Sequence, residues 1–270
     1  MSLEAKCQQL QKCLRELDSV VIGFSGGVDS SLLVAVAQQT LGNKVLAVTV
    51  ASPFCPKTET QQAEAIAIQV GCRHKIIMTN PLADPIVAAN PPDRCYYCKM
   101  GIFSQLQAIA AQEGLKHVAD GSNADDIKDY RPGMNAIKEL QIVSPLQSAG
   151  LTKLEIRELS KRFNLPTWKK ESAACLASRI PYGEMITPVK LQRVEQAEAY
   201  LSKYNFARLR VRSHADLARI EVSPVDLAKF FNPELRKAVV EQLKKLGFKY
   251  VALDLEGYRT GSLNEVLQKK

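Results

Sequence analysis

The sequence has few aromatic residues and no apolar run long enough to cross a membrane. Of its 270 residues, 6% are aromatic and one is tryptophan, whereas 46% are hydrophobic and 24% are charged. That balance is typical of a globular protein and excludes a disordered tail, a collagen-like fibre and a coiled-coil rod. No stretch reaches the ~18 apolar residues of a membrane-spanning helix. The first residues lack the apolar core of a secretory signal and include Glu4, so we expect a cytoplasmic protein without a membrane partner.

Histidine and paired-cysteine motifs are scarce, which excludes the commonest zinc sites. The three histidines, His74, His117 and His214, show no ligand spacing. A four-thiolate zinc site needs a second CxxC motif, which the chain lacks. The seven cysteines are an odd number, which argues against a disulfide framework in a reducing compartment. The question is therefore which cysteines have a chemical role.

The net positive charge of the chain comes from its second half. Residues 1–150 hold 13 Lys+Arg and 14 Asp+Glu, a balance of −1, whereas residues 151–270 hold 23 and 14, a balance of +9. An excess of this size favours contact with an anionic partner such as a phosphate group, a nucleotide or RNA. A solvated basic face explains the charge equally well.

Short apolar segments alternate with helical patterns through the first 165 residues. Five segments have the length and β-branched content of buried strands: 19–24, 44–50, 75–79, 117–121 and 141–146. Helical patterns cover 3–17, 30–41, 58–70, 97–112 and 152–163. This alternation predicts an α/β domain over residues 1–165, with a parallel sheet and helices on both of its faces.

Prolines interrupt the pattern after this domain. Pro166 and Pro181 lie in a segment with few periodic apolar positions, so residues 166–187 indicate a linker or a functional loop, and this segment carries Cys175. A smaller α+β domain is predicted over residues 188–270. Its expected elements are a helix at 189–203, strands at 207–213 and 217–223, a helix at 233–246 and a strand at 249–255.

A glycine pair follows the first predicted strand and precedes a predicted helix. The segment is Ser25-Gly26-Gly27-Val28-Asp29-Ser30-Ser31. Adjacent glycines allow a tight turn that brings backbone N–H groups close to phosphate oxygens, and the positive end of the following helix points to the same place. The three serines add hydroxyl donors, and Asp29 either holds Mg²⁺ or orders the loop. A helix N-cap after a glycine turn is the alternative.

This segment resembles the PP-loop signature of ATP pyrophosphatases, and it is not a Walker loop because no GxxxxGK[ST] occurs here. The resemblance implies cleavage of ATP between its α- and β-phosphates and adenylylation of a substrate oxygen. A second block, Gly121-Ser122-Asn123-Ala124-Asp125-Asp126, resembles the G[ST]NxxD segment of such enzymes, which implies that Gly121 and Asp125 lie near pyrophosphate and Mg²⁺. A polar strand-to-helix turn is the alternative. Lys153 and Arg157 occupy positions where the relatives have basic residues that face the phosphates, and a solvated helix residue is the alternative for each.

Three cysteines are candidates for a chemical role. Cys95 and Cys98 form a lone CxxC, which is typical of a dithiol centre, half a zinc site or part of an iron–sulfur site. A thioredoxin-like centre would lie between the first strand and helix, where the glycine loop is found. Together with Cys175 the pair makes three thiolates, which hold a cubane cluster with one iron open to sulfide or substrate. The other cysteines are predicted to be structural: Cys7, Cys13, Cys55 and Cys72.

Longer blocks are similar to the LarE family of ATP-dependent sulfur transferases in nickel-pincer nucleotide biosynthesis. They are CYYCK (95–99), DDIKDYRPG (125–133), KKESAACLASRIPYG (169–183), RLRVRSH (208–214) and ARIE (218–221). The likeness runs from the first strand to about residue 260. It implies that pyridinium-3,5-biscarboxylic acid mononucleotide is adenylylated by ATP and converted to a thiocarboxylate, and that the protein is a homo-oligomer. The physiological sulfide donor is not implied.

The resemblance leaves two sulfur sources open. Some members have one cysteine at the position of Cys175, which gives up its sulfur and becomes dehydroalanine. Others have three cysteines and are thought to carry a 4Fe–4S cluster that delivers sulfide; Cys95, Cys98 and Cys175 match this kind. A PP-loop tRNA thiolation enzyme is a further alternative, although the chain lacks an evident RNA-binding appendage, so we do not expect a nucleic-acid partner. A nucleotide-sensing module and an ammonia-using synthetase are weaker alternatives.

Basic residues of the predicted small domain are candidates for substrate binding. Arg210 and Arg212 are two apart on a strand and so share one face, where they would form a fork for a phosphate or carboxylate. Arg179 and Glu221 are further candidates. A solvated basic strand edge is the alternative. Three aromatic residues are candidates for stacking on the pyridinium or adenine ring: Tyr96, Tyr97 and Trp168. Packing in the core is the alternative for each.

Overall fold

The computed structural model describes residues 1–128, 132–171 and 174–267. Part of the DDIKDYRPG block (129–131), two residues of the predicted linker (172–173) and the last three residues (268–270) lie outside the described residues. The chain divides into two compact units. The first is Met1–Asn80 with Asp93–Ala173, and the second is Pro81–Pro92 with Ala174–Lys270. The division after residue 173 falls within the predicted linker.

The first unit is built on a four-stranded parallel sheet, as the sequence predicts. Its strands are β1 (Val20–Gly23), β2 (Val45–Ala51), β3 (Arg73–Met78) and β4 (His117–Ala119), in the order β3-β2-β1-β4. β1 pairs with β2 on one edge and with β4 on the other. The strand order thus reverses beside β1. In open α/β sheets, ligands bind beyond the carboxyl ends of the strands at such a point.

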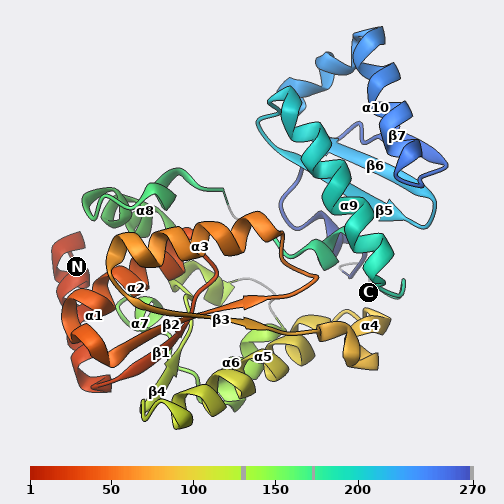
Figure 1. Ribbon diagram of the computed structural model, residues 1–270. Coiled ribbons are helices and arrows are strands. Elements are labelled where there is room, and N and C mark those ends of the chain that lie inside the picture. Colours follow the sequence, from red (N-terminus) through yellow and green to blue (C-terminus); the bar gives the residue numbers. More distant parts are fainter. Residues whose placement is uncertain (129–131, 172–173, 268–270) are drawn as a thin grey trace. The chain divides into compact units, whose positions relative to one another are not determined.

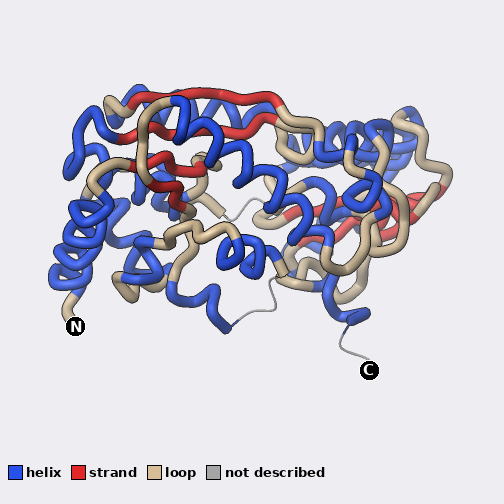
Figure 2. Tube along the Cα trace, turned by 90° about the horizontal axis from the view of Figure 1, so that it is seen from below, coloured by secondary structure: helices blue, strands red, loops and turns tan. Residues whose placement is uncertain are grey.

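Helices cover both faces of this sheet (Figures 1 and 2). Val20 and Ile22 pack into one core with buried residues of α1 (Leu3–Leu17), α2 (Val28–Leu41), α3 (Lys57–Val70) and α8 (Lys153–Arg162). Val21 packs into a second core with residues of α5 (Arg94–Gln112) and α6 (Gly133–Glu139). Because neighbouring side chains point to opposite faces, a strand buried on both faces has a continuous apolar sequence.

The predicted fifth strand, 141–146, is wrong. The structure has an isolated parallel bridge between Ala119 and Val143, followed by the short helix α7 (Pro145–Ser148). Two backbone constraints explain the difference. Gln141 has a positive φ of 53°, and Pro145 has no N–H for a ladder and begins α7 instead. Val143 alone continues the sheet.

The second unit contains a mixed three-stranded sheet, which confirms the predicted smaller α+β part of the chain. Its strands are β5 (Leu209–His214), β6 (Leu217–Val222) and β7 (Tyr250–Leu253), and its longer helices are α9 (Pro188–Leu201) and α10 (Pro233–Lys245). β5 and β6 are antiparallel, and β7 runs parallel to β6. Val211, Ile220 and Leu243 are among the residues of its core.

The second unit also includes the segment with α4 (Pro85–Ala89), which the sequence patterns did not predict. Asn90 joins it to the chain after Cys175. Its side-chain amide donates to the carbonyls of Ile180 at 3.2 Å, Pro181 at 2.7 Å and Glu184 at 3.2 Å. In the part of the chain that the structure describes, no helix has the length and hydropathy to span a bilayer.

Candidate active site

The glycine loop between β1 and α2 has a conformation that requires its first glycine. Gly26 has a φ of +69°, and a Cβ there would lie 3.0 Å from the Cβ of Ala63 in α3. Gly27 is the N-cap of α2, and no side chain in the described ranges caps this helix end. The first N–H groups of α2 are therefore available to an anion, as the PP-loop resemblance implies.

Two of the three predicted serine donors lie together in this loop. The hydroxyls of Ser25 and Ser30 are 3.1 Å apart, and the Gly27 N–H donates to Ser25 Oγ at 3.3 Å. Ser31 is fully buried, and its hydroxyl has no hydrogen-bond partner within the described residues. The structure thus groups Ser25 with Ser30 and leaves Ser31 apart, on the core side of α2.

His74 supports Phe24, the residue before the glycine loop, through Thr49. The sequence patterns did not predict this role for His74. The hydroxyl of Thr49 donates to the Phe24 carbonyl at 2.8 Å and lies 2.8 Å from Nε2 of His74. Because the single hydroxyl proton is used on Phe24, Nε2 of His74 carries a hydrogen and donates it. Burial lowers the pKa of His74, which favours the neutral ring. This chain of bonds fixes the backbone that enters the glycine loop.

The block after β4 lies against the loop. A Cβ on Gly121 would lie 3.2 Å from the backbone N of Ser30, so this position accommodates only a hydrogen without a shift. Asn123 donates from its side-chain amide to Oδ1 of Asp29 at 3.2 Å. The adjacent carboxylate, Asp120, is buried and accepts hydrogen bonds from the Ser122 backbone N–H and the Ser144 hydroxyl.

Lys153 connects the two predicted magnesium ligands. Its ammonium group pairs with Oδ2 of Asp29, and its backbone N–H donates to Oδ2 of Asp125 at 2.8 Å. The described residues contain no group of three or more His, Cys, Asp or Glu side chains that could hold a metal. Mg²⁺ in nucleotide sites commonly takes one or two carboxylates and completes its shell with phosphate oxygens and water. Asp29 and Asp125 fit that requirement.

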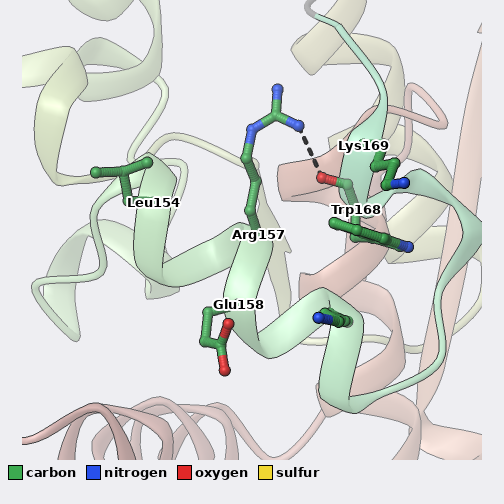
Figure 3. Close-up of a pocket in the computed structure, with 6 residues that line it drawn as sticks. Leu154, Arg157, Glu158, Trp168 and Lys169 are labelled. Carbon is green, nitrogen blue, oxygen red and sulfur yellow. Dashed lines mark hydrogen bonds between the residues drawn. The ribbon is translucent and has the colours of Figure 1, made fainter.

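The guanidinium of Arg157 bonds the backbone of a neighbouring segment. Its guanidinium donates to the carbonyls of Trp168 at 2.7 Å and Lys170 at 2.9 Å, and Figure 3 shows the first of these bonds. It therefore holds the segment with the 3-10 helix η4 (Pro166–Lys169), and its role towards the phosphates remains a prediction.

A pocket of about 450 Å³ lies beside this segment (Figure 3). Its lining residues are Leu154, Arg157, Glu158, Lys161, Trp168 and Lys169. The Trp168 ring has the ammonium groups of Lys169 and Lys161 at 4.6 and 5.3 Å from its centre. The ring is thus engaged in cation–π contacts on its own unit.

The CxxC pair lies near the start of α5, which begins at Arg94, earlier than the predicted helix start at residue 97. Cys95 and Cys98 are three residues apart and so share a helix face. Cys95 is exposed, Cys98 is half-buried, and the Arg94 guanidinium lies 3.8 Å from Cys95 Sγ. The next residue, Tyr96, donates its hydroxyl to Glu139 at 2.7 Å.

Cys175 belongs to the second unit and precedes the 3-10 helix η5 (Leu176–Arg179). It is exposed, whereas Arg179 is buried. Arg179 donates to the carbonyls of Ala174 at 2.7 Å and Cys175 at 3.1 Å, and to the Glu198 carboxylate at 2.9 and 3.0 Å. Arg179 thus fixes the backbone that presents the Cys175 thiol. The Glu198 partner was not predicted.

The predicted arginine pair of β5 divides into two different environments. Arg212 donates to both oxygens of Glu221 at 3.0 and 2.9 Å and to the Ser178 carbonyl at 2.7 Å. Glu221 is fully buried and also accepts from Arg219 at 2.8 Å. Arg210 lies 5.4 Å from the ring centre of Tyr258. Burial and the nearby Arg179 guanidinium lower the pKa of Arg210.

These contacts give the four predicted substrate residues distinct positions. Arg179 and Arg212 support the backbone of the Cys175 turn, and Glu221 supports Arg212. Their roles as direct substrate contacts remain predictions. None of the seven cysteines, all of which lie in described segments, is in a disulfide. Burial raises the pKa of Cys7 and Cys72, which suits the structural role predicted for them.

The parallel sheet with an uncapped glycine loop at its switch point defines an ATP pyrophosphatase domain of the PP-loop class. The NAD synthase family model matches residues 2–90. An uncharacterised protein of Synechocystis is 44% identical over 99% of this chain and 100% of its own length. The pyridinium-3,5-bisthiocarboxylic acid mononucleotide synthase of Lactiplantibacillus plantarum is 36% identical over 99% of this chain and 97% of its own. The chain therefore belongs to the LarE family of ATP-dependent sulfurtransferases.

A more distant likeness concerns RNA thiolation. The tRNA-specific 2-thiouridylase MnmA of Rhizobium leguminosarum is 25% identical over 63% of this chain and 54% of its own length. This identity is much lower than that of the full-length relatives.

Proposed function

We propose that this protein activates a carboxylate of pyridinium-3,5-biscarboxylic acid mononucleotide with ATP and replaces one of its oxygens with sulfur. The observation that carries the proposal is the 36% identity with the L. plantarum synthase over 99% of the chain. The glycine loop, with Lys153, Asp29 and Asn123 joined beside it, supports the ATP-dependent step.

The first step joins the substrate to AMP. A carboxylate is a poor electrophile because oxide would have to leave. Attack of a carboxylate oxygen on the α-phosphate of ATP forms an acyl adenylate and releases pyrophosphate, so AMP becomes the leaving group. The Gly27 N–H and the hydroxyls of Ser25 and Ser30 are suited to donate to phosphate oxygens.

Charge on the departing pyrophosphate needs to be offset. Lys153 lies within hydrogen-bond reach of Asp29 and bonds Asp125 through its backbone. We infer that Asp29 and Asp125 hold Mg²⁺ with ATP, which would supply positive charge to the phosphates. With the Asp29 carboxylate engaged by Mg²⁺, the Lys153 ammonium group would be able to donate to a phosphate oxygen.

The second step exchanges AMP for sulfur. Hydrosulfide adds to the acyl carbon, AMP leaves with the bonding electron pair, and a thiocarboxylate remains. We propose that Cys95, Cys98 and Cys175 hold a 4Fe–4S cluster, which would supply the sulfide when bound. Three thiolates are suitable ligands for such a cluster, and none of these cysteines is in a disulfide. Two of them share a helix face, and the third lies on a turn that Arg179 fixes. We also propose, from the family resemblance, that the protein assembles as a homo-oligomer.

The alternative source is Cys175 itself. Its thiolate would displace AMP from the acyl adenylate to form a thioester, and loss of the Cα proton with cleavage of the Cβ–S bond would leave dehydroalanine in the chain and the thiocarboxylate on the product. Cys95 and Cys98 have no role in that route. A tRNA substrate is a second alternative, supported by the distant thiouridylase likeness and the basic second half of the chain.

Product analysis tests the proposed reaction. Anaerobic protein with ATP, Mg²⁺ and the pyridinium mononucleotide is expected to yield a product in which sulfur replaces one oxygen, with one AMP and one pyrophosphate formed for each activated carboxylate. Liquid chromatography with mass spectrometry measures all three. Omission of the mononucleotide is the control for ATP hydrolysis alone. AMP formation that requires tRNA, with no reaction of the mononucleotide, would overturn the proposal.

A further inference from the structure

We propose that Lys170 is a positioning residue that fixes the glycine loop for ATP. Its ammonium group donates to the Gly26 carbonyl at 3.1 Å, to Glu59 at 2.7 Å and to Gln62 at 2.7 Å. A lysine has three N–H donors, and these three acceptors use all of them. Glu59 and Gln62 lie on α3, so Lys170 joins the loop to that helix. The inference rests on the proposed function only in that the loop binds ATP.

The bond to Gly26 orients a donor of the loop. The Gly26 carbonyl and the Gly27 N–H belong to one planar peptide and point in opposite directions. Lys170 holds the carbonyl side, so the N–H is directed to the other side, where Ser25 Oγ lies 3.3 Å away. Because both flanking residues are glycines and lack a Cβ, this peptide has few steric constraints of its own. Lys170 on the carbonyl and Ser25 Oγ on the N–H thus fix this peptide from both sides.

Lys170 is itself held in place from a different helix. Arg157 on α8 bonds the carbonyls of Trp168 and Lys170, and the first of these bonds is drawn in Figure 3. The segment from 168 to 170 thus connects α8 to the glycine loop. Arg157, which the resemblance placed beside the phosphates, acts one step away through this segment.

The charge of Lys170 also affects the loop. Lys170 and Glu59 have side-chain exposures of only 19% and 17%. Removal of the ammonium group leaves the Glu59 carboxylate without this partner next to a loop built for anions. Repulsion between Glu59 and the phosphates would then add to the lost orientation of the Gly26–Gly27 peptide.

Lys170→Met tests the proposal by nucleotide binding, which does not depend on the identity of the sulfur acceptor. The affinity for a non-hydrolysable ATP analogue with Mg²⁺, measured by calorimetry, is expected to fall about tenfold or more, as for loss of a charge-assisted hydrogen bond. In turnover assays KM for ATP rises more than kcat falls. Lys170→Arg is expected to retain part of the affinity.

Two further variants separate positioning from folding. Lys169 lies in the same segment, but its ammonium group contacts the Trp168 ring. Lys169→Met is therefore expected to bind the analogue with the affinity of the parent protein. Glu59→Gln added to Lys170→Met is expected to recover the electrostatic part of the loss. Circular dichroism and thermal unfolding check that each variant folds. Unchanged analogue affinity in folded Lys170→Met, or an equal loss in Lys169→Met, would overturn the proposal. If the parent protein binds the analogue but transfers no sulfur, the proposed function fails and the role of Lys170 does not.

Discussion

Replacement of Cys175 by serine is expected to abolish thiocarboxylate formation and to leave ATP-dependent activation intact. Arg179 and Arg212 bond backbone carbonyls of this turn, at Ala174, Cys175 and Ser178, so the substitution keeps the bonds that shape it. The glycine loop belongs to the other unit and is not altered. Sulfur transfer should fall at least about 1,000-fold, as for loss of a group that acts in the chemical step.

The measurement separates the two steps. Pyrophosphate release in the presence of the mononucleotide reports activation, and mass spectrometry reports the thiocarboxylate. Cys13→Ser, a half-buried cysteine of α1, is the matched control and should affect neither. Thiocarboxylate formation at the parent rate by Cys175→Ser would contradict the assignment of this cysteine under both sulfur sources.

The CxxC pair discriminates between those sources. If the three cysteines act together, Cys95→Ser and Cys98→Ser should lose sulfur transfer as Cys175→Ser does. If Cys175 gives up its own sulfur, both variants should still make up to one thiocarboxylate per chain. The two residues lie near the start of α5, where serine is tolerated, so folding should be retained.

Replacement of Gly26 by alanine is expected to remove ATP binding. The new Cβ would lie 3.0 Å from Ala63 Cβ and 3.1 Å from its Cα, and α3 cannot give way without moving its backbone. We expect KM for ATP to rise about 100-fold or more, because the displaced loop no longer aims its N–H groups at the phosphates. Pyrophosphate release at varied ATP measures this effect.

Gly71→Ala is the control for conformational strain alone. Gly71 has nearly the same φ, +70°, but nothing lies within 4 Å of its would-be Cβ. It should cost about 1 kcal/mol of stability and leave ATP kinetics unchanged. Ala63→Gly added to Gly26→Ala should restore only part of the activity, because the backbone of residue 63 remains close. Equal effects of Gly26→Ala and Gly71→Ala on KM would show that the clash is irrelevant.

The sheet of the first unit was predictable from sequence where its strands are continuous buried apolar runs. The bridge at Val143 was not, because a single residue makes it. The run from Val20 to Gly23 is apolar because alternate residues enter different cores, and this signal is local. Val143 adds a single bridge before Pro145, and a short apolar run does not distinguish that from a strand. The grouping of α4 with the second unit depends on Asn90, whose partners lie some 90 residues away in sequence.

The residues of the candidate site that belong to short sequence motifs were predictable from the sequence. Asp29, Asp125 and Lys153 were each predicted from their motifs, and the structure brings them together. Contacts between distant segments left no signal in the chain. The bond from Lys170 to Gly26 spans 144 positions, and the burial of Glu221 between two arginines follows from the pairing of β5 with β6.

The most direct test of the central claim is the iron and acid-labile sulfide content of protein purified without oxygen. A cubane cluster on the three cysteines predicts about four irons and four sulfides per chain. It further predicts their loss in Cys95→Ala, Cys98→Ala and Cys175→Ala and their retention in Cys13→Ala. Protein that holds no iron even after anaerobic reconstitution would contradict the three-cysteine cluster, and Cys175 would then be the sulfur donor, to be sought as dehydroalanine after turnover.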